Sequence, residues 1–505
     1  MIINKFYFFR IWVLLALGFV SCDNTDIHNS MKPNVLLLVA DDLGYGDCSA
    51  YTHHAPDVST PNIDKLAERG VLFTQGYVTA QICSPSRAGL LTGRYQQRWG
   101  VHTYTNAAFP NNELTIAEYL RDKGYSTALF GKSHLGQADD IMSPEYPLRH
   151  GFERFVGRTG GMIDYLKHSF EDQMKYPKPL NVYWGFGPWY FDDSVKEVEG
   201  YTTDIITNEA LQFIDKNKKS PFFLMMGYTE VHAWTHQMPD SALTRLGIEK
   251  IEDWDPEKEE ALEWVVRDGI GPYMADGRTR LLWHLSQLDK SVGKIISKLK
   301  ENEILENTII IFLSDNGSTK RISGNNGPLS GGKYLLEEGG IRVPYIISFP
   351  QKLPCGVNYK PMVSSMDIFP TICNLAGLEH PENVDFDGKD LVPFLKNSNA
   401  GHPHDELYWT GLSFRASEPS FEDMNSVEAK SYYSVGGDDS GWAVRKNNFK
   451  LRYFGRTDEY KLYDLDNDPG EQNDLSLTIP EITQDLKERY KQWHAGMNLP
   501  EIEIK

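Results

Sequence analysis

Two short polar segments have the residue types that bind a hard cation. Asp41-Asp42 follow the apolar run Val35 to Val39, and Asp315-Asn316 follow the apolar run Thr308 to Leu313. Continuous apolar runs of this length are typical of strands buried on both faces, and ligands bind beyond the carboxyl ends of such strands in parallel sheets. Carboxylate and amide oxygens suit Ca²⁺ or Mg²⁺. The alternative interpretation of each pair is a turn or a helix cap.

A third segment, Cys83 to Arg94, places a cysteine, a proline, a serine and an arginine close together as CSPSRAGLLTGR. Without the residues around it, Cys83 would be interpreted as a buried or free cysteine before a turn. The segment resembles the signature of the sulfatase family, C-x-P-S-R-x-x-x-L-T-G-R, at every fixed position. The resemblance implies that Cys83 is oxidised after synthesis to formylglycine (3-oxoalanine), whose hydrate supplies the nucleophilic hydroxyl. It also implies that Arg87 stabilises the formylglycine, a role that suits a permanently charged side chain with several donors.

A second motif of the same family follows at Gly131 to Gly136, GKSHLG. It resembles the family segment G-K-W-H-L-G, with Ser133 at the position of the usual tryptophan. The resemblance implies that Lys132 holds the sulfate and that His134 assists turnover of the formylglycine hemiacetal. Outside such a motif, a lysine is usually a solvated surface residue.

A third motif, Gly332 to Pro344, matches the family pattern G-K-x-x-x-x-E-G-G-x-R-V-P. This match implies that Lys333 also binds the sulfate. His232 lies in the sequence EVHAW, where Val231 replaces the proline that the family more often shows. We expect His232 to bind substrate and to protonate the leaving alcohol, with His236 as the competing assignment.

The resemblance further implies a bound Ca²⁺, with Mg²⁺ as the alternative. Cleavage of a sulfate monoester increases the negative charge on the leaving oxygen, so a cation and fixed positive side chains favour it. One hydroxyl of the hydrated aldehyde would attack sulfur in line, and the second would then expel sulfate. The implied metal ligands are Asp41, Asp42, Asp315, Asn316 and Cys83.

The elements that must position these residues form an α/β pattern. Besides the two runs described above, Pro221 to Tyr228 and Ile341 to Phe349 are predicted strands, and apolar residues recur at helical spacing from Leu288 to Leu299. The family resemblance implies an alkaline phosphatase-like fold. We therefore expect a large, mostly parallel central sheet that is flanked by helices.

The sequence changes in character after about residue 400. Short alternating segments, Gly441 to Phe454 and Tyr460 to Leu465, predict a small antiparallel sheet, and a final helix is predicted near Pro480. We therefore predict a catalytic domain over residues 33–400 and a smaller α+β subdomain over residues 401–505.

The N-terminus predicts export. Lys5 and Arg10 precede an apolar run, Ile11 to Val20, that is too short for a confident membrane span, and Ser21-Cys22 follow. The pattern resembles a bacterial lipoprotein signal, so we predict a signal peptide over residues 1–21, lipid attachment at Cys22, and a polar tether over residues 22–32. The expected location is the periplasm or the cell surface. Secretory cleavage without a lipid is the alternative.

Composition excludes some classes of protein. The formal net charge of −19 disfavours nucleic acid as a partner, because nucleic acid binding depends on Lys and Arg that neutralise phosphates. Apart from Cys22 and Cys83, the chain has Cys48, Cys355 and Cys373. Three cysteines permit at most one disulfide, so the fold must depend on its hydrophobic core.

The substrate is the least determined feature. The segments Gly160 to His168 and Val182 to Asp193 combine aromatic and polar residues, which pack against sugar rings but also serve as core or loop anchors. We take Asp164, His168 and Trp184 as candidate substrate residues.

The interpretation that follows is an exo-acting O-sulfatase. Its expected substrates are galactose or N-acetylhexosamine units of a glycosaminoglycan, a mucin or an algal polysaccharide. Its expected partners are a formylglycine-generating or anaerobic sulfatase-maturating enzyme, and the membrane through the lipid anchor. The alternatives are a phosphate or phosphonate ester hydrolase on the same scaffold, and an inactive glycan-binding lipoprotein.

Overall fold

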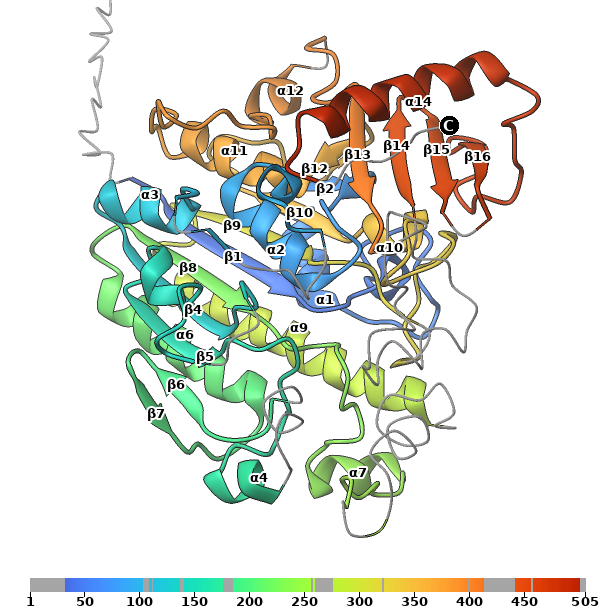
Figure 1. The fold of residues 1–505 in the computed structure, drawn as a ribbon. Coiled ribbons are helices and arrows are strands. Elements are labelled where there is room, and N and C mark those ends of the chain that lie inside the picture. The colour runs from blue at the N-terminus through green and yellow to red at the C-terminus, as the bar shows by residue number, and fades with distance from the viewer. Residues whose placement is uncertain are drawn as a thin grey trace, which may run out of the picture. The chain divides into compact units, whose positions relative to one another are not determined.

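The computed structural model describes residues 32–102, 109–110, 112–136, 140–175, 185–255, 258, 276–319, 322–397, 399–412, 441–455 and 457–499. Its central feature is a ten-stranded sheet (Figure 1). A four-stranded sheet and a two-stranded sheet are separate from it. The predicted signal peptide, Cys22 and nearly all of the predicted tether lie outside the described residues.

The large sheet is mixed, and its middle is parallel. Strand β1 pairs in parallel with β8 and β9, and β4 pairs in parallel with β5 and β8. Strand β10 is antiparallel to β9, and β6 is antiparallel to β5. The spatial order is β11 (Val357–Tyr359), β2 (Val71–Phe73), β10 (Tyr345–Ser348), β9 (Thr308–Ser314), β1 (Asn34–Ala40), β8 (Phe222–Gly227), β4 (Ser126–Lys132), β5 (Arg154–Arg158), β6 (Trp189–Phe191) and β7 (Ser194–Lys196).

Both faces of this sheet are buried. Leu36 and Leu38 of β1 belong to one hydrophobic cluster, whereas Val35, Leu37 and Val39 belong to another. The first cluster includes residues from α1 (Pro61–Glu68), α6 (Thr202–Asn217) and α9 (Gly277–Glu301). The second includes residues from α2 (Cys83–Thr92), α3 (Ile116–Asp122) and α11 (Ile368–Leu375).

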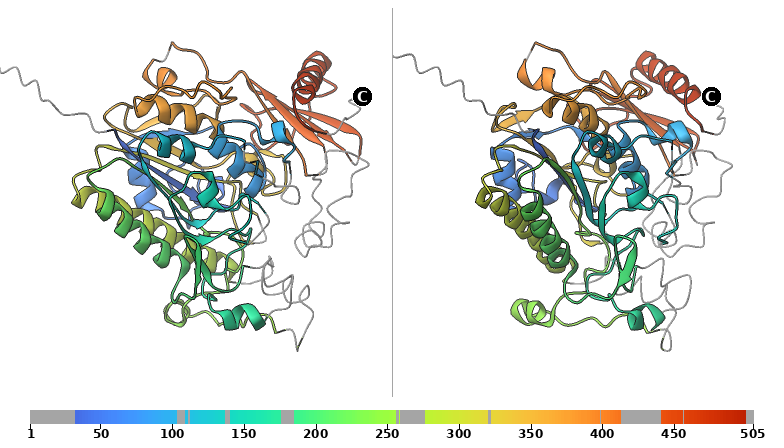
Figure 2. Two further views of the ribbon diagram at one scale, coloured as in Figure 1. Left: turned by 60° about the vertical axis from the view of Figure 1, so that its left-hand side comes forward. Right: turned by 90° about the vertical axis from the view of Figure 1, so that its left-hand side faces the viewer.

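Figure 2 shows α6 in green and α9 in yellow-green, side by side along one face of the sheet. Successive residues of a strand point to opposite faces, so a continuous apolar run fits a sheet that is covered by helices on both sides. The predicted α/β fold with flanking helices is confirmed.

The strand register brings four strand ends to the same edge. Ala40 at the end of β1 pairs with Ser314 at the end of β9. On the other side of β1, Val39 pairs with Gly227 of β8, and Gly227 pairs with Gly131 of β4. Residues that follow these four parallel strands therefore lie close together, which is the geometry expected of a ligand site.

The small sheet is antiparallel, in the order β13 (Glu406–Thr410), β14 (Trp442–Lys446), β15 (Phe449–Phe454) and β16 (Glu459–Asp464). Helix α14 (Pro480–Ala495) packs against it, with the Tyr490 ring stacked on Trp442 at a centroid distance of 4.0 Å. Figure 1 shows α14 running across these strands. The sheet and the final helix agree with the expected elements, while the domain boundary at residue 400 stays a prediction.

The predicted strand over 341–349 is partly wrong. Only Tyr345–Ser348 forms β10, because Ile341 ends the short helix α10 (Glu338–Ile341) and Arg342 bridges to Tyr77 instead. The remaining elements are short connections. They are η1 (Tyr45–Asp47), β3 (Gly76–Tyr77), η2 (Gln96–Trp99), η4 (Pro147–His150), α4 (Phe170–Lys175), α7 (Asp240–Leu246), β12 (Val363–Ser364), η7 (Ser365–Asp367) and α12 (Val392–Lys396).

Cys48, Cys83, Cys355 and Cys373 are free, in agreement with a fold that does not depend on disulfides. Within the described ranges, no helix is both long enough and apolar enough to cross a membrane.

Candidate active site

Cys83 is the first residue of α2, so its side chain lies at the amino end of a helix. The positive end of the helix dipole and the unpaired backbone amides there favour negative charge. Pro85 is tolerated because the first turn needs no backbone donor at that position. Arg87 lies one helical turn after Cys83 and therefore shares its face. The sulfatase-like motif thus has a direct structural reason for its spacing.

The thiol of Cys83 faces the two acidic residues that follow β1. Its Sγ lies 3.4 Å from Oδ1 of Asp41 and 3.9 Å from Oδ1 of Asp42. Asp41, Asp42, Cys83 and His232 each offer a ligand atom within 4.8 Å of the others, and all four residues are buried. The structure therefore brings the predicted nucleophile position and the predicted metal ligands into one cluster.

Two lysines pair with the same two carboxylates. The ammonium of Lys132, at the end of β4, lies 2.6 Å from Oδ2 of Asp41. The ammonium of Lys333 lies 2.9 Å from Oδ2 of Asp42 and 2.9 Å from Nε2 of His232. Both lysines are buried, so they are not the solvated surface residues that isolated lysines usually are.

Asp315 and Asn316 complete the cluster from the end of β9. Arg87 donates from Nε to Oδ2 of Asp315 at 2.8 Å and from Nη1 to the carbonyl of Lys132 at 2.9 Å. Asn316 donates from Nδ2 to Oδ1 of Asp42 at 2.7 Å. Its Oδ1 is buried and has no hydrogen-bond partner within the described structure. An unpaired buried amide oxygen beside carboxylates is the donor set that a hard cation accepts.

The electrostatics of these carboxylates also fit a cation site. Burial raises the pKa of Asp41 to about 7 although Lys132 opposes the shift, and burial likewise raises the pKa of Asp42 against the effect of Lys333. For Asp315, burial is outweighed by Arg87 and Lys132, and the pKa is lowered. Asp41 and Asp42 therefore ionise less readily than Asp315, and a divalent cation between them would favour their ionised forms.

The geometry separates the two candidate histidines. His232 contacts Lys333 and lies 3.6 Å from Asp42, whereas His236 pairs with Asp253 at 2.9 Å. Burial and Lys333 lower the pKa of His232 well below its ordinary value. The structure thus places His232 in the cluster and His236 outside it.

His134 follows Lys132 closely and lies near the same cations. Burial and the charges of Lys132 and Arg87 lower its pKa well below the ordinary value. Asp42 and His134 both have left-handed backbone, with φ of 59° and 46°. Non-glycine residues in this region are strained and are concentrated at functional sites. This feature is visible only in the folded chain.

A glycine allows Lys132 to reach the cluster. Gly131 has a φ of 102°, and a Cβ there would lie 2.0 Å from the carbonyl oxygen of Gly227. Only glycine permits this backbone conformation and this close approach between β4 and β8. The glycine that precedes the lysine in the motif is therefore required by packing at the strand ends.

Among the described residues, no hydrogen bond or ion pair joins the candidate substrate residues Asp164 and His168 to the cluster. Both are buried and pair with each other, with 3.6 Å between Nδ1 of His168 and Oδ2 of Asp164. Asp164 accepts from the amide of Leu166 at 2.9 Å, and His168 accepts from the indole of Trp189 at 3.2 Å. These contacts fix the loop that carries Asp164 and His168. Contact of either residue with a sugar stays a prediction. Trp184 lies outside the described residues.

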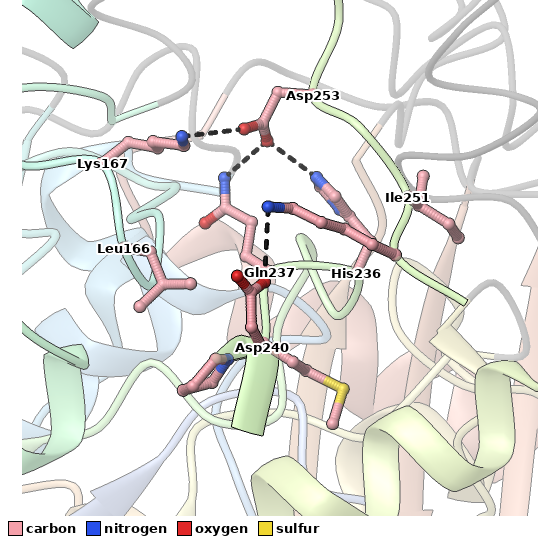
Figure 3. Close-up of a pocket in the computed structure, with 10 residues that line it drawn as sticks. Leu166, Lys167, His236, Gln237, Asp240, Ile251 and Asp253 are labelled. Carbon is pink, nitrogen blue, oxygen red and sulfur yellow. Dashed lines mark hydrogen bonds and ion pairs between the residues drawn. The ribbon is translucent and has the colours of Figure 1, made fainter. Parts of the chain in front are cut away.

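A cavity of about 250 Å³ lies near His236 (Figure 3). Lys167, Gln237 and Asp253 lie on its wall and contact one another through Asp253. Lys167 belongs to the segment Gly160 to His168 that the sequence indicates for sugar packing, but Gln237 and Asp253 belong to no motif. The three residues come from separate loops that only folding brings together.

Comparison with known proteins agrees with this geometry. A family model described as Sulfatase matches residues 33–378, and one described as N-sulphoglucosamine sulphohydrolase, C-terminal, matches residues 332–495. The steryl-sulfatase of Homo sapiens is 28% identical over 561 aligned positions, which cover 94% of this chain and 90% of the relative. The N-acetylgalactosamine-6-sulfatase of Rattus norvegicus is 32% identical over 428 positions, which cover 80% and 72%.

A solved structure extends the similarity to the whole fold. The crystal structure of Ps i-CgsB in complex with k-i-k-neocarrahexaose superposes with a TM-score of 0.74 at 28% identity. The superposition covers 94% of this chain and 95% of that chain.

Proposed function

Because the chain belongs to the sulfatase family and is a sulfuric ester hydrolase, we propose that it releases O-sulfate from a carbohydrate through a formylglycine derived from Cys83. The observation that carries the proposal is the position of Cys83 at the start of α2, with its Sγ 3.4 Å from Asp41 and two buried lysines beside the same carboxylates. A buried thiol that served packing alone would not need this charged environment.

The group at position 83 in the active enzyme would be formylglycine, and its hydrate would supply the nucleophilic hydroxyl. Position 83 is the amino end of α2, and Arg87 of the same helix donates to Asp315. Burial raises the pKa of the unmodified Cys83 thiol well above its ordinary value. An unmodified Cys83 is therefore a poor nucleophile, since the thiolate is the reactive form.

The metal would be Ca²⁺, which would polarise the sulfate oxygens and offset their charge. Its ligands would come from Asp41, Asp42, Asp315 and Asn316, whose oxygens follow β1 and β9, together with the group at position 83. The unpaired Oδ1 of Asn316 supports this assignment. Mg²⁺ is the alternative, and it prefers fewer protein ligands and more water.

The remaining charged residues have separate tasks. Lys132 and Lys333 would bind the sulfate oxygens, because their ammonium groups are held in place by the acidic pair. His232 contacts Lys333 and is the residue we assign to protonation of the leaving alcohol, while His134 would assist turnover at position 83. Fixed charges in a buried site stabilise a developing anion more strongly than charges in water do.

We assign the substrate to the glycans because the chain is similar to proteins that act on sugars or were crystallised with them. One relative is named for N-acetylgalactosamine 6-sulfate, and Ps i-CgsB was crystallised with neocarrahexaose. Galactose or N-acetylhexosamine sulfates at a chain end are therefore the proposed substrates, with export as a lipoprotein through residues 1–22. A maturation enzyme that oxidises Cys83 is the required partner.

Sulfate release from a defined panel tests the proposal. The panel contains galactose, N-acetylgalactosamine and glucosamine sulfated at single positions, with an aryl sulfate, a steroid sulfate and a phosphate monoester. Mass spectrometry first confirms the conversion of Cys83. Release from one sugar regioisomer supports the proposal, whereas release from the steroid sulfate alone moves the substrate to sterols. Cleavage of the phosphate ester alone contradicts the assigned reaction.

A further inference from the structure

A cavity of about 250 Å³ lies between the loop that carries Lys167 and the segments that carry His236 and Asp253 (Figure 3). Pockets for drug-sized ligands have volumes of about 300–1,000 Å³, so this cavity suits one small ring. Its wall includes apolar side chains and a few polar groups, which is the usual composition of a ligand site. The apolar residues include Leu166, Met238 and Ile251, and the polar residues include Lys167, Gln237 and Asp253.

The polar groups on the wall are held in fixed positions. Asp253 accepts from Gln237 at 3.1 Å and contacts His236 at 2.9 Å and Lys167 at 3.3 Å, as Figure 3 shows. Gln237 in turn accepts from the amide of Tyr165 at 2.8 Å. Burial opposes ionisation of Asp253, but the hydrogen bond and charge of His236 outweigh it and lower its pKa. Preorganised donors and acceptors of this kind recognise hydroxyl groups with little ordering cost.

The lysines on the wall are paired with carboxylates. Lys167 pairs with Asp253, and Lys250 pairs with Asp240 at 3.3 Å. The active-site cluster differs, because its paired lysines are buried. A wall whose lysines are already paired does not favour a second sulfate or a uronate. It suits a neutral ring with several hydroxyls and an apolar face, which is a description of an unsulfated sugar.

The cavity and the reaction site share two loops. His232 and His236 are four residues apart, a separation that spans at most about 14 Å of extended chain. The loop with Lys167 is tied to the same segment, because Tyr165 donates from its hydroxyl to the carbonyl of Thr229 at 3.2 Å. One end of this shared wall contacts the sulfate-binding lysine and the other end lines the cavity. The reaction site and the cavity wall are therefore connected by one short chain segment.

We propose that this cavity is a sugar subsite, which binds the neutral residue adjacent to the sulfated unit. The inference rests on the proposed glycan substrate and adds that the enzyme recognises at least a disaccharide. The apolar residues Leu166, Met238 and Ile251 contact the ring, and Lys167, Gln237 and Asp253 bind its hydroxyls. A longer substrate is consequently preferred to a free monosaccharide sulfate.

The test compares kcat/KM for two substrates of matured enzyme. One is the best monosaccharide sulfate of the panel, and the other is the same unit linked to unsulfated galactose. We expect at least a tenfold preference for the disaccharide. Ile251→Trp places a bulky ring in the cavity and should remove that preference. Lys167→Ala should remove it as well. Because the Lys167 side chain is half-exposed, this second variant is expected to fold even if Ile251→Trp does not. Val195→Trp adds the same ring at an exposed position of β7 and retains the preference.

A binding measurement separates failure of the subsite from failure of the proposed function. Calorimetry with unsulfated β-1,4-galactobiose and N,N′-diacetylchitobiose requires no sulfatase activity. Binding of either sugar that Ile251→Trp abolishes supports the subsite even if no sulfated sugar is cleaved. The subsite is overturned if neither disaccharide binds, if Ile251→Trp and Lys167→Ala keep the full preference, or if a neighbouring uronate is preferred to galactose.

Discussion

Two buried charge clusters in this protein differ in the groups that accompany their ion pairs. The active-site cluster contains Asp41, Asp42, Cys83, Lys132 and Lys333. The second, here the Glu338 cluster, joins α10 to the small sheet through Glu338, Tyr77, Lys450 and Glu471. Glu338 contacts Lys450 at 3.0 Å and accepts from the Tyr77 hydroxyl at 2.5 Å, while its amide donates to Glu471 at 2.7 Å.

The pKa values of single carboxylates differ between the clusters. Burial opposes ionisation of Glu338, but Lys450 and Arg445 outweigh it and lower its pKa to about 2. In the active-site cluster, burial prevails and raises the pKa of Asp41 to about 7.

Each cluster also contains a carboxylate whose pKa is shifted the other way, because burial raises the pKa of Glu471, whereas Arg87 and Lys132 outweigh burial and lower the pKa of Asp315. Buried ion pairs and their pKa shifts alone therefore do not identify a functional site. The active-site cluster is distinguished by Cys83 at the start of a helix and by the unpaired Oδ1 of Asn316.

The largest expected effect is on the active-site cluster. Cys83→Ala removes the position at which formylglycine forms, and we expect sulfate release to fall on the order of 10⁴-fold or more, as for loss of a catalytic nucleophile. Cys355→Ser changes an exposed free cysteine and serves as the control with unchanged activity. Appreciable turnover by Cys83→Ala on the preferred substrate would contradict the assignment.

The next effect is on stability through the Glu338 cluster. Glu338→Gln removes one of the two carboxylates that contact the buried Lys450, which also lies 3.1 Å from Glu471, so we expect the free energy of unfolding to fall by about 3 kcal/mol in denaturant titrations. Glu306→Gln removes the pair with Arg69, in which Glu306 is 63% exposed, and should cost below about 1 kcal/mol. Equal losses in the two variants would show that the buried pair stabilises the fold no more than the exposed pair does.

The same variant predicts a pH dependence. The folded pKa of Glu338, about 2, lies below its ordinary value of 4.5, so its contribution to stability is present above pH 4.5 and is lost as the pH falls toward 2. Wild type should therefore lose stability more steeply than Glu338→Gln below pH 4.5. Parallel stability curves over that range would show that Glu338 is not held ionised by its partners.

Lys333→Met tests the fixed cation of the active-site cluster. Loss of one preorganised positive group should lower kcat/KM about 100-fold, which corresponds to about 2.7 kcal/mol. Steady-state kinetics on the preferred sulfated sugar measure it, with Lys219→Met on an exposed lysine as the control. A loss confined to folding, with normal kcat/KM for the folded fraction, would argue that Lys333 only compensates Asp42.

Calcium should stabilise the active-site cluster specifically. At free Ca²⁺ about 100 times its Kd, the free energy of unfolding should rise by about 2.7 kcal/mol over protein treated with a chelator. Asn316→Ala should weaken this gain, whereas Asn302→Ala, at the exposed end of α9, should keep it. If both variants respond as wild type does, the Asn316 oxygen is not a ligand.

Local patterns predicted the elements around the site well. The buried strands at 35–39 and 308–313 are observed as β1 and β9, each one residue longer at one or both ends, and the helical spacing over 288–299 lies within α9. These segments are predictable because their apolar periodicity reflects burial directly. The strand predicted at 341–349 failed at its start, since Arg342 pairs with Tyr77, a partner 265 positions away that no local pattern reveals.

By itself the sequence determined the family, the α/β class and the polar residues beyond the strand ends, because motifs and periodicity are local properties of the chain. Only the tertiary structure decided that His232 rather than His236 contacts Lys333, that Asp164 and His168 lie together in the interior, and that a cavity forms beside His236. Those outcomes depend on distances between segments far apart in the chain. Such distances arise from strand register and loop packing, which no single segment encodes.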